Sequence, residues 1–468
     1  MSGDQPARER SLRRIQRQLG ETLLWPGITT ALRECAAQNT LLHAAPAMRA
    51  VADLGSCHAG PFLVSYVLWI LDDAQRRGIR HLYFLARDGQ ILLDIARRIQ
   101  SADRRKYKIE LHYLHASRRA WFAPSVNGWQ RDLLERILDE DAGGFSASSA
   151  ARRLGFPDLE AMLACWPQLT EAAAGWQQRS QLIDSLLDTV SKDAAARHFQ
   201  VLRHEMLEYL EQQGLTASAT DWAIVDLGWR GRMQESLARC LAGEAAAGST
   251  SRGYYLALLE NPHWPAGKHA AHCLWPGNKH GVLAELPGPA TLIELLCQAD
   301  HGSTTGYARD AEGCLQPVFT PEIEAPLADW GWATYRAAVL AFTDALIAAC
   351  KLTPASKLPP QELSRCAFLF CRELFRYPPP AIAQCFASMP FSDSADHDDC
   401  KAVAAPASLL DSLLWALTLG KRAAPPINPR LWPIGSIARC GHPLPLSLFV
   451  ALKSAMERLG LTRRCELP

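Results

Sequence analysis

Residues 79–92 read IRHLYFLARDGQIL, and this stretch sets the expected fold. The largely apolar run 79–86 predicts a buried strand. Arg87-Asp88-Gly89 predicts a tight turn directly after it, and residues 90–99 predict a helix. A strand, a turn and a helix in immediate succession form the opening unit of an α/β sheet.

The same pattern returns further along the chain. Strands are expected at 108–115, 222–226 and 253–259, and a helix at about 232–241 follows the third strand. A helix over 62–77 is expected before the first strand. Strands that alternate with helices are typical of a parallel sheet, so the sequence predicts an α/β fold.

The chain on either side of these strands has helical patterning. Apolar residues at helical spacing near the N-terminus predict a helix that ends at Trp25-Pro26-Gly27. About a hundred residues between the second and third strands lack strand patterning and predict a helical insertion. We therefore expect an N-terminal helical segment at 1–50 and a helical C-terminal region at 321–468. Between them, the α/β core would have two parts, 51–123 and 221–320, separated by the helical insertion at 124–220.

Composition excludes several classes of protein. The chain has 468 residues, 48% hydrophobic and 21% charged, which is typical of a globular protein. Its formal charge of +1 argues against a general nucleic-acid binder. The longest apolar run, 61–71, is too short for a bilayer span, and no secretory signal follows the basic N-terminus. The 14 cysteines include no CxxC pair, so we expect reduced thiols and a cytoplasmic protein, or one peripheral at the inner membrane.

Charged and small side chains follow three of the predicted strands. The strand ends carry Arg87-Asp88-Gly89, then Ser117-Arg118-Arg119, then Asp226 to Gly231. The carboxyl ends of parallel strands form one ligand-binding edge. Arginines bind anions there, small residues let backbone N–H groups approach a phosphate, and acids bind Mg²⁺ or sugar hydroxyls. The combination predicts a phosphorylated, metal-bound sugar, although each piece alone also fits a plain turn or a helix cap.

Other metal and nucleotide motifs are not met. Gln90 stands where a HAD phosphatase has its second aspartate, and Gly228 and Gly231 alone do not make a dinucleotide fingerprint. We expect structural or surface roles for a set of possible metal ligands, His269, His272, Cys273 and His280. The acidic run 393–399 lacks the spacing of a calcium loop and is expected to be solvated.

Several strings in the middle of the chain resemble a known family. They are HLYFLARDGQIL at 81–92, YLHASRRA at 113–120, VDLGWRGRMQESL at 225–237, GYYLAL at 253–258 and LIELLCQADHGSTTGY at 292–307. Over roughly residues 55–320 the chain is similar to phosphoribosyltransferases of bacterial capsule and O-antigen loci. Members often occur fused to HAD phosphatases or glycosyltransferases.

The resemblance implies a fold, a reaction and a set of partners. It implies a type I phosphoribosyltransferase-like parallel sheet and transfer of 5-phosphoribose from PRPP, with Mg²⁺, to a sugar hydroxyl of a growing glycan. The acceptor would be lipid-linked or an oligosaccharide, and a HAD phosphatase and glycosyltransferases would be partners. One usual feature is absent, because Leu227 stands where such enzymes carry a second acid after Asp226.

Site residues follow from the strand ends and from the resemblance together. We predict catalytic roles for Asp88, Arg87, Asp226 and Glu294, with Asp88 ahead of Glu294 as general base. Asp88 and Asp226 would hold the metal. Donor binding is assigned to Gly89, Ser117, Arg118, Gly228, Trp229, Arg230, Gly231 and Gln234. Two alternatives remain open: a nucleotide-sugar-dependent glycosyltransferase, and a non-catalytic scaffold of a polysaccharide assembly complex.

Overall fold

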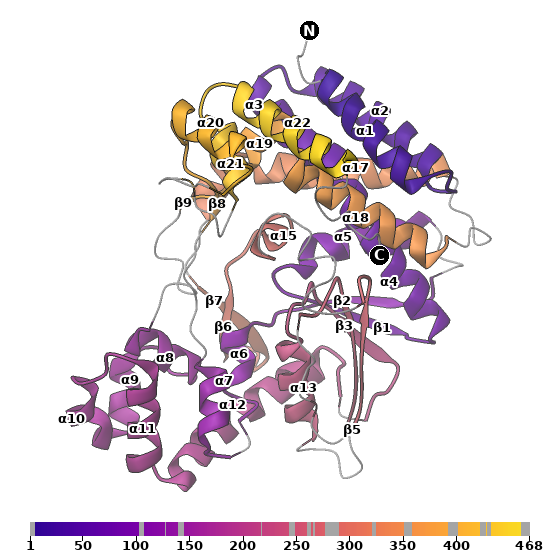
Figure 1. Cartoon of the computed structure of the whole chain (residues 1–468). Helices are drawn as coiled ribbons and strands as arrows, with labels where there is room; N and C mark the ends of the chain where they lie inside the picture. Colours follow the sequence, from indigo (N-terminus) through magenta and orange to yellow (C-terminus); the bar gives the residue numbers. More distant parts are fainter. Residues whose placement is uncertain are drawn as a thin grey trace.

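The structure is a computed structural model of the whole chain (Figure 1). It describes residues 5–102, 107–126, 128–138, 145–216, 218–242, 249–259, 264, 267–276, 290–320, 324–350, 358–391, 401–421, 427 and 432–459. The acidic run 393–399 and His280 lie outside the described residues.

A five-stranded parallel sheet forms the centre of the fold, as the alternating pattern predicts. Its order is β2-β1-β3-β4-β5, so β1 lies between β2 and β3. Leu85 at the end of β1 is opposite Leu114 of β2, and Phe84 is opposite Val225 of β3. The strands are β1 His81–Leu85, β2 Glu110–Leu114, β3 Trp222–Val225, β4 Ser249–Tyr255 and β5 Gly267–Cys273.

Alternating residues of the inner strands face two separate layers of helices. Leu82 and Phe84 of β1 join a hydrophobic cluster with α4 (Gly60–Arg76) and α5 (Gly89–Ala102). Tyr83 and Leu85 face the opposite side, where α12 (Lys192–Gln212) and α13 (Arg232–Ala242) cover the sheet. Both faces are therefore covered, as in most parallel sheets, because crossover helices lie on each side.

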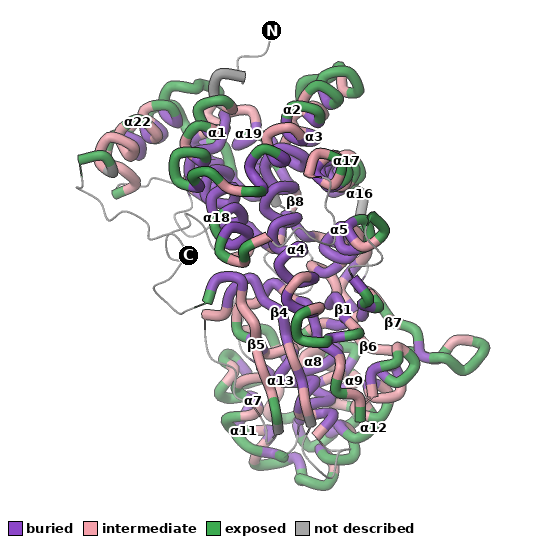
Figure 2. Tube along the Cα trace, turned by 90° about the vertical axis from the view of Figure 1, so that its right-hand side faces the viewer, coloured by how far each residue is buried: buried purple, intermediate pink, exposed green. Residues whose placement is uncertain are grey.

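The N- and C-terminal helices pack together over the α4 layer. One continuous hydrophobic cluster joins them to the sheet, and Figure 2 shows the buried residues along α4 and α18. Arg14 of α1 pairs with the buried Glu373 of α18, with Nη2 2.7 Å from Oε2. The helices are α1 Gln5–Leu19, α2 Trp25–Leu42, α3 Pro46–Asp53, a π-helical turn Leu54–Ala59, α16 Glu324–Trp330, α17 Trp332–Cys350, α18 Pro360–Arg376, α19 Pro380–Ala387, α20 Leu409–Leu417, α21 Pro433–Ala438 and α22 Leu444–Arg458.

Trp25-Pro26-Gly27 does not end the first helix, so that prediction is wrong. Helix α1 ends at Leu19, and Trp25 begins α2 with proline in its first turn. A proline is tolerated there because the first N–H groups of a helix have no intrahelical acceptor. The same residue type that breaks a helix interior therefore starts this one.

The chain between β2 and β3 is helical, as expected. Its helices are α6 Arg118–Phe122, α7 Arg131–Ile137, α8 Ala147–Arg153, α9 Leu159–Cys165, the 3₁₀ turn Pro167–Leu169, α10 Thr170–Ala173, α11 Arg179–Thr189 and α12. Most of them share a hydrophobic cluster of their own, which includes Trp129, Trp166 and Phe199. Helix α12 links that cluster to the sheet, because Met206 and Leu210 pack on the β1 face.

Several strands have no counterpart in the sequence prediction. β5 was missed because GKHAAHC has no apolar alternation, and as the last strand it pairs only with β4. An antiparallel hairpin, β6 Thr304–Arg309 and β7 Leu315–Phe319, follows the short helix α15 Thr291–Leu295. A second small pair joins β8 Pro390–Phe391 and β9 Lys401–Ala402.

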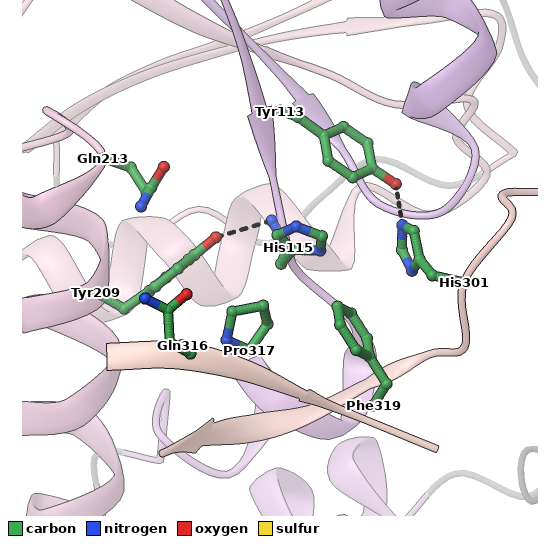
Figure 3. A pocket seen from close by; sticks show the side chains of 8 residues that line it. All are labelled: Tyr113, His115, Tyr209, Gln213, His301, Gln316, Pro317 and Phe319. Atoms are coloured by element: carbon green, nitrogen blue, oxygen red, sulfur yellow. Dashed lines mark hydrogen bonds between the residues drawn. The ribbon is translucent and has the colours of Figure 1, made fainter. Parts of the chain in front are cut away.

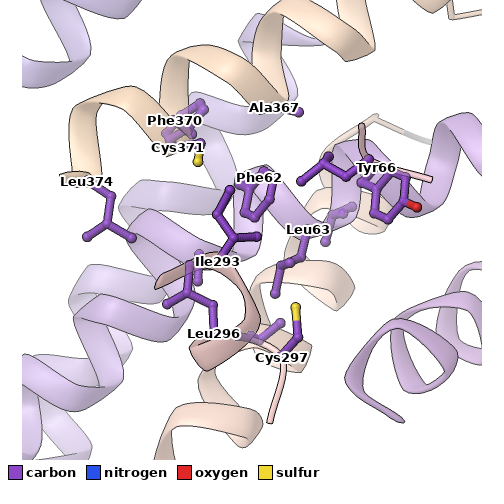
Figure 4. Packing of buried hydrophobic residues seen from close by; sticks show 14 of the residues in the cluster. Phe62, Leu63, Tyr66, Ile293, Leu296, Cys297, Ala367, Phe370, Cys371 and Leu374 are labelled. Atoms are coloured by element: carbon purple, nitrogen blue, oxygen red, sulfur yellow. The ribbon is translucent and has the colours of Figure 1, made fainter. Parts of the chain in front are cut away.

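Two helical stretches are long and apolar enough to cross a membrane by length and composition. They are Pro46–Arg76 and Trp332–Cys350. The apolar window of the first is 100% buried inside the protein and that of the second is 33% buried. The first stretch contributes Phe62, Leu63 and Tyr66 to the central cluster, which is the behaviour of a core helix (Figure 4).

Candidate functional site

Strand order changes direction between β1 and β3. From β1 the chain moves to β2 on one side, then crosses back to β3 on the other side and continues outward. Ligands of open parallel sheets bind at the carboxyl ends of the strands beside such a reversal. The two loops at this point begin with Arg87-Asp88-Gly89 after β1 and with Asp226 after β3.

Three carboxyl groups from different elements interact electrostatically there. Asp88 follows β1, Asp226 follows β3, and Glu294 lies on α15. Burial raises the pKa of Asp88 well above its usual range, and the charges of Glu294 and Asp226 raise it further. Burial is also the largest cause that raises the pKa of Asp226 to about 7, and Glu294 adds to it. Clustered acids with raised pKa values are typical of functional sites.

Two guanidinium groups act on the same carboxyls. The charges of Arg87 and Arg118 lower the pKa of Asp88, although they do not offset burial and the neighbouring acids. Arg118 also lowers the pKa of Asp226. The site therefore combines acids that attract a cation with arginines that attract an anion, which suits a metal-bound phosphate.

Hydrogen bonds fix the loop after β3. The Asp226 carboxylate accepts a bond from the N–H of Leu227 at 2.8 Å, and its main-chain carbonyl accepts one from the Tyr66 hydroxyl at 2.7 Å. The indole N–H of Trp229 donates to Oε1 of Glu294 at 2.7 Å. Thus α4, the β3 loop and α15 hold one another around the carboxyl cluster.

Helix α15 is anchored by the hydrophobic core. Ile293 and Leu296, on either side of Glu294, pack with α4 and α18, as Figure 4 shows. The Tyr335 hydroxyl of α17 donates to the carbonyl of Leu296 at 2.8 Å. The position of Glu294 therefore depends on helices from three distant parts of the chain.

The glycines of both loops have structural requirements of their own. Gly228 has φ +142° and a side-chain Cβ there would lie 2.2 Å from the carbonyl oxygen of Ala257. Gly231 has φ +64°, and a Cβ on Gly89 would lie 2.8 Å from the Phe84 backbone. The peptide bonds Ala86-Arg87 and Gly228-Trp229 are cis. A tight fold thus requires these glycines whether or not they bind a phosphate.

Two of the predicted donor-binding side chains are engaged inside the protein. Gln234 is 0% exposed, and its amide bonds to Ser251, to the Ala270 carbonyl and to the Tyr255 hydroxyl. It joins α13 to β4 and β5, so the structure gives its side chain a packing role instead of the ligand contact that we predicted. The Ser117 hydroxyl caps α6 by accepting from Ala120 N–H, and it donates to the Thr304 carbonyl. Arg230 is exposed on the β3 loop.

A cavity of about 440 Å³ lies beside the end of β2 (Figure 3). Its walls come from β2, α12 and the β6–β7 hairpin, and they combine aromatic rings, imidazoles and amides: Tyr113, His115, Tyr209, Gln213, His301, Gln316, Pro317 and Phe319. Burial is the largest cause that raises the pKa of the Tyr113 phenol, and the charge of Asp88 is the next largest. Tyr113, in the cavity wall, therefore lies within electrostatic reach of Asp88.

Hydrogen bonds orient the ring of His301. Its Nδ1 lies 2.8 Å from the carbonyl oxygen of Gly302, which can only accept, so the Nδ1 N–H donates there. Nε2 of the same ring is hydrogen-bonded to the Tyr113 hydroxyl at 2.7 Å (Figure 3). The two side chains therefore form a connected part of the cavity wall.

His115 has an unused polar atom. Its buried Nδ1 has no hydrogen-bond partner among the described residues. Burial is the main cause that lowers the pKa of the ring to about 4, and His301 adds to it. His115 is therefore neutral near pH 7, and a ligand hydroxyl or a water would satisfy Nδ1.

Sequence reasoning did not single out the cavity residues. Tyr113 and His115 are two positions apart at a strand end, so they share a face, and that spacing was a usable signal. Phe319 and Gln316 come from a hairpin that the pattern did not predict. Among other candidate ligands, His269 and His272 lie three residues apart in β5 and thus on opposite faces.

No known protein-family model matches the chain, and no curated protein matches it.

Proposed function

We propose that this chain is a glycosyltransferase that moves 5-phosphoribose from PRPP to a sugar hydroxyl of a growing capsule or O-antigen glycan. The observation that carries the proposal is the group of Asp88, Asp226 and Glu294 with Arg87 and Arg118 at the reversal of strand order. The family resemblance of residues 55–320 supplies the donor and the acceptor class. The finer assignment of the sheet to a phosphoribosyltransferase-like core belongs to this proposal.

The carboxyl cluster fits Mg²⁺ in its chemistry. Magnesium prefers oxygen ligands and is commonly held by one or two carboxylates together with substrate phosphates. Asp88 and Asp226 would hold it. When bound, the ion would neutralise charge on the pyrophosphate of the donor.

The arginines and the β3 loop would position the donor. Arg87 and Arg118 would contact the pyrophosphate and stabilise the negative charge that grows on it as the C1–O bond breaks. Backbone N–H groups in the loop from Gly228 to Gly231 would hold the 5-phosphate. Both contacts fix C1 of the ribose in front of Asp88.

Asp88 would act as the general base. A carboxylate whose pKa lies above its usual range is, in its ionised form, a stronger base than an ordinary aspartate. The acceptor oxygen forms a bond to C1 while the bond from C1 to pyrophosphate breaks. The hydroxyl proton moves to Asp88 and pyrophosphate leaves from the opposite face, so the configuration at C1 inverts.

The cavity beside Tyr113 would receive the acceptor sugar. Aromatic rings such as Phe319 suit the apolar faces of sugar rings, while the amide of Gln316 and Nδ1 of His115 suit hydroxyls. Its volume of about 440 Å³ is within the range of small-molecule sites. Asp88 acts electrostatically on Tyr113 in the wall of this cavity, and in the proposed complex a hydroxyl of a sugar seated there would reach the base.

The aromatic cavity also favours one alternative. Rings such as Tyr113 and Phe319 could stack on a nucleobase, in which case the donor would be a nucleotide sugar and the arginines would bind its diphosphate. This reading requires the cavity for the donor, whereas the first reading requires it for the acceptor. Competition between ligands therefore distinguishes them.

A thermal-shift screen tests the proposal directly. The purified chain is heated with PRPP, UDP-sugars or GDP-sugars, each with and without Mg²⁺. PRPP with Mg²⁺ is expected to raise the melting temperature, since a ligand at one hundred times its Kd adds about 2.7 kcal/mol of stability. Stabilisation by a nucleotide sugar and not by PRPP would overturn the proposal in favour of the alternative. Tyr113→Phe and Gln316→Ala should leave the PRPP shift intact.

A further inference from the structure

Two histidines and a glutamate meet at the amino ends of β1 and β2, the opposite end of the sheet from the carboxyl cluster. His81 begins β1, and Glu110 and His112 lie on β2. In the parallel register His81 is opposite Glu110, and Tyr83 is opposite His112. Residues two apart on one strand share a face, so all these side chains project to the same side.

The three ligand atoms form a compact triangle. Nδ1 of His81 lies 3.2 Å from Nε2 of His112 and 3.6 Å from Oε2 of Glu110, and the remaining side, from His112 to Glu110, is 3.9 Å. The in-plane centre of a triangle with these sides lies about 2.1 Å from each ligand atom, close to zinc–nitrogen and zinc–oxygen bond lengths. Among the described residues this is the one group of three or more potential ligands whose atoms all lie within 4.8 Å of one another.

The surroundings hold the ligands in place. The ring of Tyr83, itself buried, stacks on His112 with centroids 4.6 Å apart. Nδ1 of His81 and Nε2 of His112 hydrogen-bond to each other in this structure, so the two rings already point at the same place. Glu110 is exposed, which leaves room for a water as a fourth ligand.

We propose that His81, His112 and Glu110 form a Zn²⁺ site that joins strand β2, at the edge of the sheet, to β1. Two imidazoles and a carboxylate are an established zinc ligand set, and Mg²⁺ would disfavour the nitrogens. The site is separate from the proposed transferase chemistry, because all of strand β1 lies between His81 and the Asp88 loop.

Calorimetric titration of ZnCl₂ into the untagged, chelator-treated chain tests the site. One saturable site is expected in the wild type, and Glu110→Gln and His112→Gln should each weaken it at least tenfold. His204→Gln is the matched control, since His204 and Glu208 are a surface pair 3.9 Å apart that belongs to no group of three ligands in the part of the chain that the structure describes, and this variant should bind zinc like the wild type.

Two further readouts keep the test independent of activity and of folding. Zinc should raise the melting temperature of the wild type and of His204→Gln by similar amounts, and that of Glu110→Gln by less at the same zinc concentration. Cobalt in place of zinc should give the visible absorption of a four-coordinate ion in the wild type and in His204→Gln. The absorption should be weaker or absent in Glu110→Gln and His112→Gln. Absence of zinc binding at micromolar concentration, or binding that Glu110→Gln and His112→Gln leave unchanged, would overturn the site.

Discussion

Nε1 of Trp229 lies 2.7 Å from Oε1 of Glu294, and this hydrogen bond joins the loop after β3 to helix α15. The two residues are 65 positions apart in sequence. Through this contact the carboxylate of Glu294 is held beside Asp88 and Asp226, whose pKa values it raises.

Trp229→Phe should lower transfer activity while the protein stays folded. The variant keeps a ring but removes the N–H group that holds Glu294, and a hydrogen bond to a charged group is worth about 1.5–3 kcal/mol. We expect kcat/KM for PRPP to fall by about tenfold or more. Trp330→Phe is the control, because it loses an indole bond to the Cys385 carbonyl far from the site. Equal losses in both variants would argue against a role for the Trp229 contact.

Asp88→Asn should abolish transfer, with a loss of about 10²–10⁴ in kcat if Asp88 is the base. Its melting temperature should not fall, because a buried carboxyl with a raised pKa destabilises the folded state when ionised and the amide carries no charge. Pyrophosphate release and thermal unfolding are measured on the same sample. Wild-type turnover would remove Asp88 from the mechanism.

Asp226→Asn should flatten the dependence of stability on pH. With a pKa of about 7 in the folded protein against 3.8 as the ordinary value, Asp226 keeps its proton when the unfolded chain has lost it. Stability of the wild type therefore falls as pH rises from about 4 to 7, and the loss is complete above 7. The melting temperature of Asp226→Asn should therefore increase relative to that of the wild type as the pH rises through this window. If the difference in melting temperature between Asp226→Asn and the wild type stays constant from pH 4 to pH 8, the raised pKa of Asp226 is contradicted.

Gly228→Ala should destabilise the protein strongly, before any effect on donor binding is seen. Its φ of +142° is rarely adopted by residues with a side chain, and the new Cβ would collide with the Ala257 carbonyl. Gly306→Ala is the matched control, since no atom lies within 4 Å of its added Cβ. Chemical denaturation measures the free energy of unfolding of both variants. A Gly228→Ala variant as stable as the control would mean that this loop is not packed as described.

Glu373→Ala should destabilise the packing of α1 against α18. Its buried carboxylate accepts bonds from Arg14 and from the Ser11 hydroxyl, and breaking a buried ion pair costs about 3 kcal/mol or more. Glu9→Ala removes an exposed partner of Arg13 and should change the free energy of unfolding by less than about 1 kcal/mol. Similar effects of the two variants would show that α1 contributes little to folding.

Local sequence determined the parallel sheet and the placement of Asp88 and Asp226 at one edge. Apolar runs such as HLYFL and WAIV, each followed by a turn, leave few alternatives to buried strands, and parallel strands bring their carboxyl ends together. The neighbouring position of the two acids follows from that geometry.

Tertiary structure alone decided which distant segments complete the candidate site. The inward direction of Gln234, the anchoring of Glu294 by α4, α17 and α18, and the cavity between β2 and the β6–β7 hairpin depend on contacts between distant segments. Local patterns cannot specify these, because they state which residues will be buried but not against what. The same limit applies to Pro26, which starts a helix only because the chain turns before it, and to His81, which meets Glu110 and His112 only through strand register.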